Sequence, residues 1–222
     1  MKLRAVLTGD IIDSSRLKEV KFQTVMEQLR NELVRLEETE VINLYEMYRG
    51  DAFQAYISNP RVGLKVLFKI RTLINSLKSV RDKRGQQPTY NIRLSLGIGN
   101  VSNEPDNMRT KKTPFMLSGQ ALDEISAEDS TIAVKTEDEF INQELQTEFF
   151  LLEYILKNWT PVSAGIMYKK LYGFTERQIA DELDISQSAV NQHSSQAYWN
   201  GIQKLMERYR VIINNLQNEE NG

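Results

Sequence analysis

The feature of this sequence that most constrains its fold is a change of pattern near residue 136. Before it, short segments with alternating apolar and polar residues stand between longer segments whose apolar residues recur at steps of three and four. Alternation is typical of strands and the longer spacing of amphipathic helices. After Lys135 the strand pattern ends and only helical segments follow. We therefore expect an α+β domain over 1–136 and an all-helical domain over 137–222.

In the first domain the pattern predicts strand, helix, strand, strand, helix, strand, short helix and strand. The first six elements match the ferredoxin-like split βαβ arrangement, an antiparallel sheet with helices on one face. Strands are expected at 2–8, 41–48, 52–57, 90–97 and 131–134, and helices at 14–38, 60–80 and 120–127. In the second domain helices are expected at 138–158, 161–172, 176–183 and 187–209.

Composition excludes several classes of protein. The chain of 222 residues has no cysteine and one histidine, which rules out disulfides, thiolate metal sites and zinc sites built on several imidazoles. No apolar run approaches the roughly 20 residues of a membrane span, and no signal peptide is recognisable, so we expect a cytoplasmic protein. The net charge of −2 divides into +4 over 1–135 and −6 over 136–222, so charge alone does not indicate a nucleic-acid partner.

Two short motifs of the first domain carry aspartates at expected strand ends. Asp10 follows the first strand, and Asp51 lies in the turn of the expected hairpin. In a split βαβ sheet the first strand and this hairpin are neighbours, so we expect both carboxylates to meet at one edge. Two carboxylates with a backbone carbonyl suit Mg²⁺ or Mn²⁺, because such ions complete their shell with waters and phosphates.

Groups beside these aspartates are expected to contact a nucleotide. A helix starting soon after Asp10 would offer free N–H groups to a phosphate. The predicted nucleotide-binding residues are Ile11, Ile12, Ser14 and Gly50. An alternative without function stays open, because aspartate is common at helix N-caps and in hairpin turns.

Three segments resemble the successive motifs of class III nucleotide cyclases: 6–12, 49–53 and 93–99. In those enzymes the matching aspartates bind metal ions, in a palm-type fold that diguanylate cyclases also use. The whole chain is more similar to the bacterial SatD-like family, which pairs a Gly-Asp-Ile-Ile-Asp-Ser start and a Gly-Asp-x-Phe-Gln hairpin with a C-terminal helical segment. The resemblance implies a cyclase-like palm over about 3–135, with Asp10 and Asp51 as metal ligands.

Three positions depart from the cyclase pattern. Met47 stands where those enzymes place a base-recognising lysine, and Asp123 and Ala127 stand where they place an asparagine and an arginine. An arginine acting on a transferring phosphoryl group can contribute about 10³ or more in rate. We therefore expect this chain to bind a metal and nucleotide without efficient cyclisation.

The second domain contains a segment that predicts a helix-turn-helix at about 175–196. Thr175 is followed three residues later by Gln178, as a capping box requires. Ser186 can cap the second helix, and the pattern Gln-Ile-Ala-x-x-Leu-x-Ile-Ser-x-x-x-Val resembles many bacterial regulators. In those proteins the second helix enters the major groove of DNA.

The exposed positions of the second helix are expected to be short, neutral, hydrogen-bonding side chains that suit base edges. The predicted DNA-binding residues are Arg177, Gln187, Ser188, Asn191, Gln192 and Ser195. Segment 160–222 has 6 basic and 7 acidic residues, so non-specific affinity for DNA should be weak. A helical pair used only for packing or dimerisation is the alternative.

The sequence thus favours a DNA-binding transcriptional regulator with a degenerate, nucleotide-cyclase-like sensory domain. The expected partners are double-stranded DNA, a nucleotide and a second copy of the chain, since paired half-sites favour two-fold proteins. The alternative is a Mg²⁺-dependent nucleotide-processing enzyme, cyclase or nucleotidyltransferase-like, whose helical segment serves docking or dimerisation.

Overall fold

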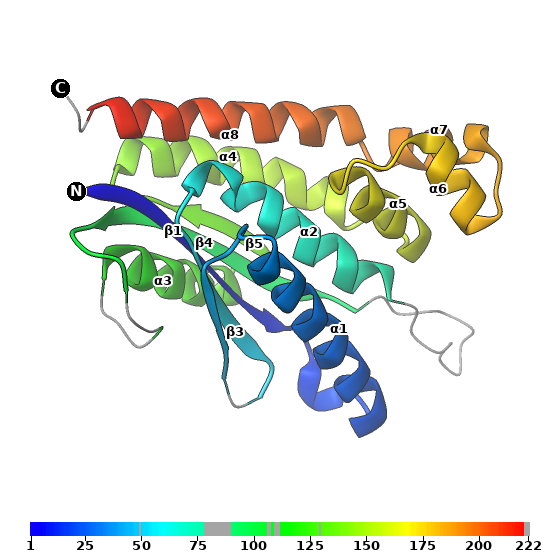
Figure 1. The fold of residues 1–222 in the computed structure, drawn as a ribbon, viewed down its shortest axis with the longest axis horizontal. Helices are drawn as coiled ribbons and strands as arrows, with labels where there is room; N and C mark the ends of the chain where they lie inside the picture. The colour runs from blue at the N-terminus through cyan, green and yellow to red at the C-terminus, as the bar shows by residue number, and fades with distance from the viewer. Residues whose placement is uncertain (49, 78–89, 106–107, 109–111, 129, 220–222) are drawn as a thin grey trace.

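A mixed five-stranded sheet forms the centre of the computed structural model, which describes residues 1–48, 50–77, 90–105, 108, 112–128 and 130–219 (Figure 1). Its strands are β1 (Lys2–Ile11), β2 (Leu44–Met47), β3 (Ala52–Ile57), β4 (Ile92–Val101) and β5 (Ile132–Lys135), in the order β2-β3-β1-β4-β5. All neighbours are antiparallel except β4 and β5. The antiparallel arrangement expected for the first six elements is present in β1 to β4. Strand β5, which follows those elements, pairs in parallel with β4, because a helix crosses over between the two strands and a parallel pair requires such a crossover.

The helices depart from the prediction mainly at their ends. They are α1 (Glu19–Glu38), α2 (Gly63–Ser76), α3 (Thr113–Ala127), α4 (Glu139–Leu156), α5 (Pro161–Leu171), α6 (Glu176–Leu183), α7 (Gln187–Gln196) and α8 (Trp199–Glu219), with short 3₁₀ helices η1 (Ser14–Arg16) and η2 (Pro60–Val62). The single helix expected over 187–209 is two helices, because Tyr198 has a left-handed backbone with φ of 60°. None of the described helices is long and apolar enough to cross a membrane.

Helices cover both faces of the sheet. Side chains of a strand alternate between faces, so Leu7 of β1 enters the main core while Val6 joins a small cluster with Phe115 of α3. Helix α3 therefore lies on the face opposite to α2 (Figure 1). The expectation of helices on one face concerned the first six elements, and α3 follows them. A side chain at Gly97 would lie 2.3 Å from the amide nitrogen of Ser118, so only glycine lets α3 approach β4 this closely.

One hydrophobic core contains residues from both sides of position 136. Leu145 and Phe149 of α4 and Ile213 of α8 are buried in the same cluster as Leu7. Tyr209 of α8 is also buried, and its hydroxyl donates to the carbonyl oxygen of Pro60 at 2.6 Å. All strands thus lie before the boundary proposed at 136 and only helices follow it, while the two parts share one interior.

Candidate metal and nucleotide site

Strand β1 brings the predicted aspartates to neighbouring positions. It pairs Asp10 with Ala52 of β3 on one side and with Arg93 of β4 on the other. Asp51 immediately precedes Ala52 in the β2–β3 hairpin. Gly9 makes this close register possible, because a Cβ there would lie 2.7 Å from the Phe53 ring and 2.8 Å from the Arg93 carbonyl oxygen. The two aspartates therefore lie at the same end of the sheet.

Arg93, which the sequence patterns did not single out, occupies this end of the sheet together with the aspartates. Its Nε donates to Asp10 Oδ1 at 3.0 Å and one terminal nitrogen donates to Asp10 Oδ2 at 2.6 Å. The hydrogen bond to Asp10 raises the pKa of Arg93, and the charges of Asp10, Asp51 and Asp13 add to that effect. Three carboxylates thus act on one guanidinium, which leaves the cluster with a net negative charge.

The donor set fits a magnesium ion only in part. Asp10 and Asp51 offer the few hard oxygens that Mg²⁺ requires, and phosphates or waters would complete the shell. Among the described residues no group of three or more His, Cys, Asp or Glu side chains could hold a metal ion. Arg93 already occupies both oxygens of Asp10, so a cation would have to share or displace that ion pair.

The backbone near the predicted nucleotide-binding residues differs from the expectation. Strand β1 continues through Asp10 to Ile11, so no helix starts there, and the Ile12 N–H donates to the Asn91 carbonyl oxygen at 3.0 Å. Ser14 opens the three-residue η1, and α1 starts only at Glu19. Gly50 lies exposed in the hairpin with φ of 103°. The strand pairing with β4 explains the difference, since it satisfies the backbone groups that a helix start would leave free.

A row of polar side chains continues from the aspartates along the face that α3 covers. Thr8 lies two residues before Asp10 on β1 and therefore on the same face. Its hydroxyl donates to Ser118 Oγ of α3 at 2.9 Å and accepts from Gln54 Nε2 of β3 at 3.2 Å. Tyr48 Oη in turn donates to Gln54 Oε1 at 2.7 Å. This network ties β1, β3 and α3 together beside the aspartates.

The three departures from the cyclase pattern also lie around this part of the fold. Met47 ends β2 next to the hairpin, and Asp123 and Ala127 are exposed on α3. Because Gly99 contacts Thr113 at the start of α3, this helix runs antiparallel to β4 and its last turn lies toward Arg93. The described α3 residues therefore bring an acidic rather than a basic side chain toward this end of the sheet.

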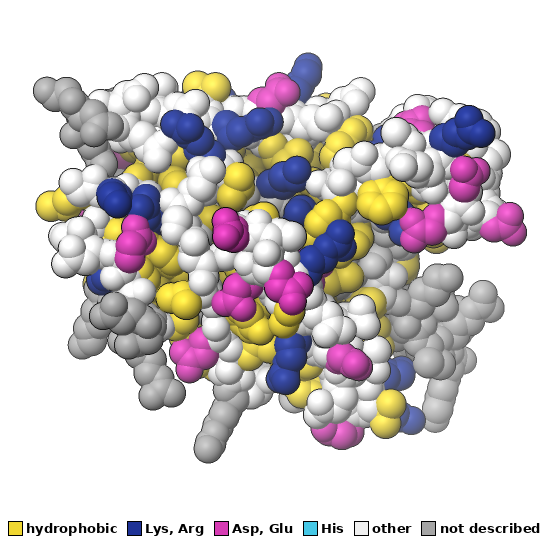
Figure 2. All heavy atoms as spheres, in the orientation of Figure 1, with side chains coloured by type: hydrophobic (Ala, Val, Ile, Leu, Met, Phe, Trp, Pro, Cys, Tyr) yellow, Lys and Arg dark blue, Asp and Glu magenta, His cyan; other side chains and the backbone are white. Residues whose placement is uncertain are grey.

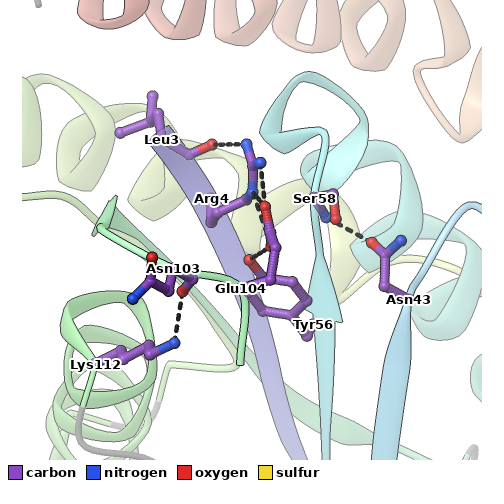
Figure 3. A network of polar contacts seen from close by, with 8 residues as sticks. All are labelled: Leu3, Arg4, Asn43, Tyr56, Ser58, Asn103, Glu104 and Lys112. Atoms are coloured by element: carbon purple, nitrogen blue, oxygen red, sulfur yellow. Dashed lines mark hydrogen bonds and ion pairs between the residues drawn. The ribbon is translucent and has the colours of Figure 1, made fainter. Parts of the chain in front are cut away.

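A second ion pair lies on the same face toward the other end of β1 (Figure 3). Arg4 Nε donates to Glu104 Oε1 at 3.1 Å, and the Tyr56 hydroxyl also donates to Glu104. These two donors lower the pKa of Glu104 to about 2, and burial together with Glu104 raises the pKa of Tyr56. A carboxylate held in this way is a structural anchor for the segment after β4 and not a proton acceptor near neutral pH.

The predicted helix-turn-helix segment forms two helices joined by a tight turn. Both bonds of the capping box at Thr175 and Gln178 are present, and Asp184 turns the chain with φ of 53°. Buried side chains of α5, α6 and α7 form a small separate cluster, which consists of Ile166, Ile179, Ala180 and Val190. The side chains predicted to contact DNA are all exposed: Arg177 on α6, and Gln187, Ser188, Asn191, Gln192 and Ser195 on α7.

Comparison with known proteins gives one family and several distant folds. A model of the SatD family matches residues 5–203. The active GGEEF domain of a diguanylate cyclase from Vibrio cholerae is 13% identical, with 62% of this chain and 85% of that chain covered and a TM-score of 0.41. The GGDEF domain of DgcB from Caulobacter crescentus, in complex with c-di-GMP, is also 13% identical, with coverages of 60% and 77% and a TM-score of 0.39. Similarities of this size carry no information about chemistry, and no curated protein matches the chain.

Proposed function

The chain belongs to the SatD family, and we propose that its sheet binds a nucleotide together with Mg²⁺ or Mn²⁺ at Asp10 and Asp51, as a metal-dependent nucleotide-processing protein. The observation that carries the proposal is the strand register, which pairs Asp10 with the residue directly after Asp51. Neighbouring carboxylates at a strand end and a hairpin are the ligands that a magnesium–phosphate complex needs.

Arg93 has two roles in this proposal. Without a ligand it neutralises Asp10 through two hydrogen bonds. When a cation takes over the Asp10 carboxylate, the guanidinium becomes free to donate to a phosphate oxygen, for which its planar fork is suited. The bound metal would supply charge neutralisation to the phosphates. Ala127 and Asp123 offer no further positive charge, so binding is expected to exceed turnover.

Titration calorimetry with ATP, GTP, CTP and UTP, with and without Mg²⁺, tests the proposal. We expect binding of at least one nucleotide that requires Mg²⁺ and weakens at least ~10-fold in Asp10→Asn and Asp51→Asn. Asp181→Asn is the matched control, because this exposed aspartate lies on α6 and not at this end of the sheet. Mg²⁺-independent binding, or equal losses in all three variants, would contradict the proposal.

A second candidate function is sequence-specific DNA binding by α7. The exposed, neutral face of Gln187, Asn191 and Gln192 favours it, because amide side chains pair with base edges in the major groove. One observation argues against strong DNA binding. Glu176 lies beside this face and accepts a 3.5 Å hydrogen bond from Asn191. A second copy of the chain would be needed to reach paired half-sites.

Genome-wide footprinting of the tagged protein tests DNA binding. The wild type is expected to enrich discrete sites that a Gln187→Ala/Asn191→Ala/Gln192→Ala variant loses. Gln203→Ala, an exposed glutamine on α8, should leave the pattern unchanged. Equal enrichment by the wild type and the triple variant would remove α7 as the reader of DNA.

A further inference from the structure

A cavity of about 340 Å³ lies where η2 and α2 meet α5 and α8, away from the aspartate site. Its size is within the range of small-molecule pockets. Four cationic side chains line it, namely Arg61, Lys65, Lys170 and Arg210, and no carboxylate is among its lining residues. Figure 2 shows Lys and Arg side chains gathered where α8 lies over α2. The arrangement concentrates positive charge around a concave surface, which attracts anions.

Three of these cations have no carboxylate partner within the described residues. Arg210 Nε donates to the Met206 carbonyl oxygen of its own helix at 3.3 Å. Lys65 of α2 is exposed and forms no ion pair with another described residue. Arg61 donates to Gln217 Oε1 at 3.0 Å, which leaves its charge uncompensated. Lys170 is the exception, with an ion pair to Glu176 at 2.8 Å. The cavity therefore has about three positive charges available to a ligand.

The walls of the cavity are apolar between these charges. Leu64 and Leu171 are buried at its base, and the indole of Trp199 lies half-buried in its wall. The ammonium of Lys170 lies 5.8 Å from the centre of the Trp199 ring. An aromatic face beside cations suits a ligand that has a planar body and several negative charges.

We infer that this cavity binds a phosphorylated small molecule with a planar body, such as a nucleoside diphosphate, independently of metal at Asp10 and Asp51. Lys65 and Arg210 hold the phosphates, and Trp199 contacts the planar group. The concave shape distinguishes this ligand from a DNA backbone, which requires an open surface.

A ligand in this cavity would also change the contacts of α7. Lys170 and Trp199 line an adjoining cavity together with Glu176, Asn191 and Ser195. A bound phosphate that attracts Lys170 would break its ion pair with Glu176. The Glu176 carboxylate, which accepts a hydrogen bond from Asn191 of α7, would then be released. The site is therefore connected to the helix whose exposed face is the second candidate function.

Calorimetric titration of the full chain with ADP and with pyrophosphate, in buffer containing EDTA, tests the inference. Without divalent ions the proposed aspartate site cannot bind a metal–nucleotide complex. A negative result in this titration is therefore distinguishable from a negative result for the metal-dependent proposal. We expect ADP binding that Lys65→Ala/Arg210→Ala weakens about 10-fold or more, because each phosphate loses charged donors. Lys157→Ala/Lys204→Ala removes two exposed charges that do not line the cavity and should change the Kd less than ~2-fold.

A further variant separates the two halves of the ligand. Trp199→Leu should weaken ADP but leave pyrophosphate binding unchanged, since only ADP has a ring system to contact the indole. No binding of either probe to the wild type would overturn the inference, and so would equal effects of the two double variants. Loss of affinity for a 20-base-pair duplex in Lys65→Ala/Arg210→Ala, with ADP binding unaffected, would also overturn it and assign the surface to nucleic acid.

Discussion

At the scale of single residues, the ion pair between Arg93 and Asp10 is expected to control what the proposed aspartate site binds. The two side chains are only 27% and 21% exposed and are joined by two hydrogen bonds, so a ligand must replace these bonds to reach the Asp10 oxygens. A metal ion and the guanidinium compete for the same oxygens. The site is therefore expected to respond differently to a metal alone and to a metal–nucleotide complex.

Replacement of Arg93 by glutamine should have opposite effects on these two ligands. Affinity for Mn²⁺ alone should rise about 3- to 10-fold, because the competing charge is gone, whereas affinity for the Mn²⁺–nucleotide complex should fall, because a phosphate donor is lost. Electron paramagnetic resonance of free Mn²⁺ measures the first and calorimetry the second. Arg16→Gln, which removes an exposed arginine paired with Asp13, is the control. Changes of the same sign for both ligands would show that Arg93 does not exchange partners.

Lys69 provides a second test at the residue scale, this time of stability. It is buried on α2 with its ammonium 3.7 Å from the centre of the Tyr172 ring. Burial, and then the charge of Lys65, lower its pKa to about 8, while Glu32 opposes the shift. Between this pKa and the value near 10.4 of an unfolded lysine, the unfolded chain binds more protons. The free energy of unfolding should therefore rise as the pH increases from about 8 to 9.5.

Urea denaturation at several pH values checks this prediction in the wild type and in Lys69→Met. The rise should be present in the wild type and absent from the variant, which has no titrating ammonium at this position. The predicted rise in the free energy of unfolding is limited to pH values below 10. Above pH 10, ionisation of tyrosines in the unfolded chain lowers the stability. Parallel curves for the two proteins would show that Lys69 does not titrate in this range.

The sequence predicts part of the aspartate site and not the rest. Asp10 and Asp51 stand beside glycines at the ends of alternating segments, so their convergence follows from strand order alone. Arg93 enters only through the register of β1 with β4, which local patterns do not specify. The missing helix start after Asp10 has the same cause, because pairing with β4 extends β1 to Ile11 against the turn preference of Gly9-Asp10.

At the scale of elements, the turn between α6 and α7 depends on one left-handed residue. Asp184 has φ of 53° and ψ of 48°, where a glycine is free of the steric cost that other residues bear. The helix boundaries here agree with the pattern in the sequence, since both helices carry caps in the chain itself, at Thr175 and Ser186. By contrast, the break at Tyr198 places a left-handed backbone on an aromatic residue, which its local sequence does not favour. Gly201, three residues later, leaves room for the Tyr198 ring, since a Cβ there would lie 2.0 Å from it.

Replacement of Asp184 by glycine should stabilise the protein by up to about 1 kcal/mol, because it removes the strain of the left-handed backbone. The matched control is Asp181→Gly, in the exposed interior of α6, which should destabilise by about 1 kcal/mol. Thermal unfolding monitored by circular dichroism compares them. A loss of stability in Asp184→Gly as large as in the control would contradict the turn described here.

At the scale of the whole molecule, the sheet and the C-terminal helices share one core although the sequence pattern divides them at 136. The pattern detects the division because only the first part alternates as strands do. It does not detect that α4 and α8 bury their apolar faces on the same side of the sheet as α2, since amphipathicity does not specify a partner.

A substitution that leaves a void in the shared core should therefore lower the stability of both parts together. Ile213→Ala on α8 is expected to cost about 2–4 kcal/mol, whereas Val211→Ala, at an exposed position two residues earlier, should cost less than about 0.5 kcal/mol. Amide hydrogen exchange should show equal losses of protection in β1 and in α4. Losses confined to residues after 136 would show instead that the two parts unfold independently.

The proposed metal–nucleotide site is tested most directly by the paramagnetic broadening of backbone amide resonances by Mn²⁺ in the presence of a nucleotide. We expect broadening centred on the end of β1 at Asp10 and on the β2–β3 hairpin at Asp51, and its disappearance in Asp51→Asn. Broadening centred elsewhere, or unchanged in that variant, would contradict a metal–nucleotide site at these two aspartates.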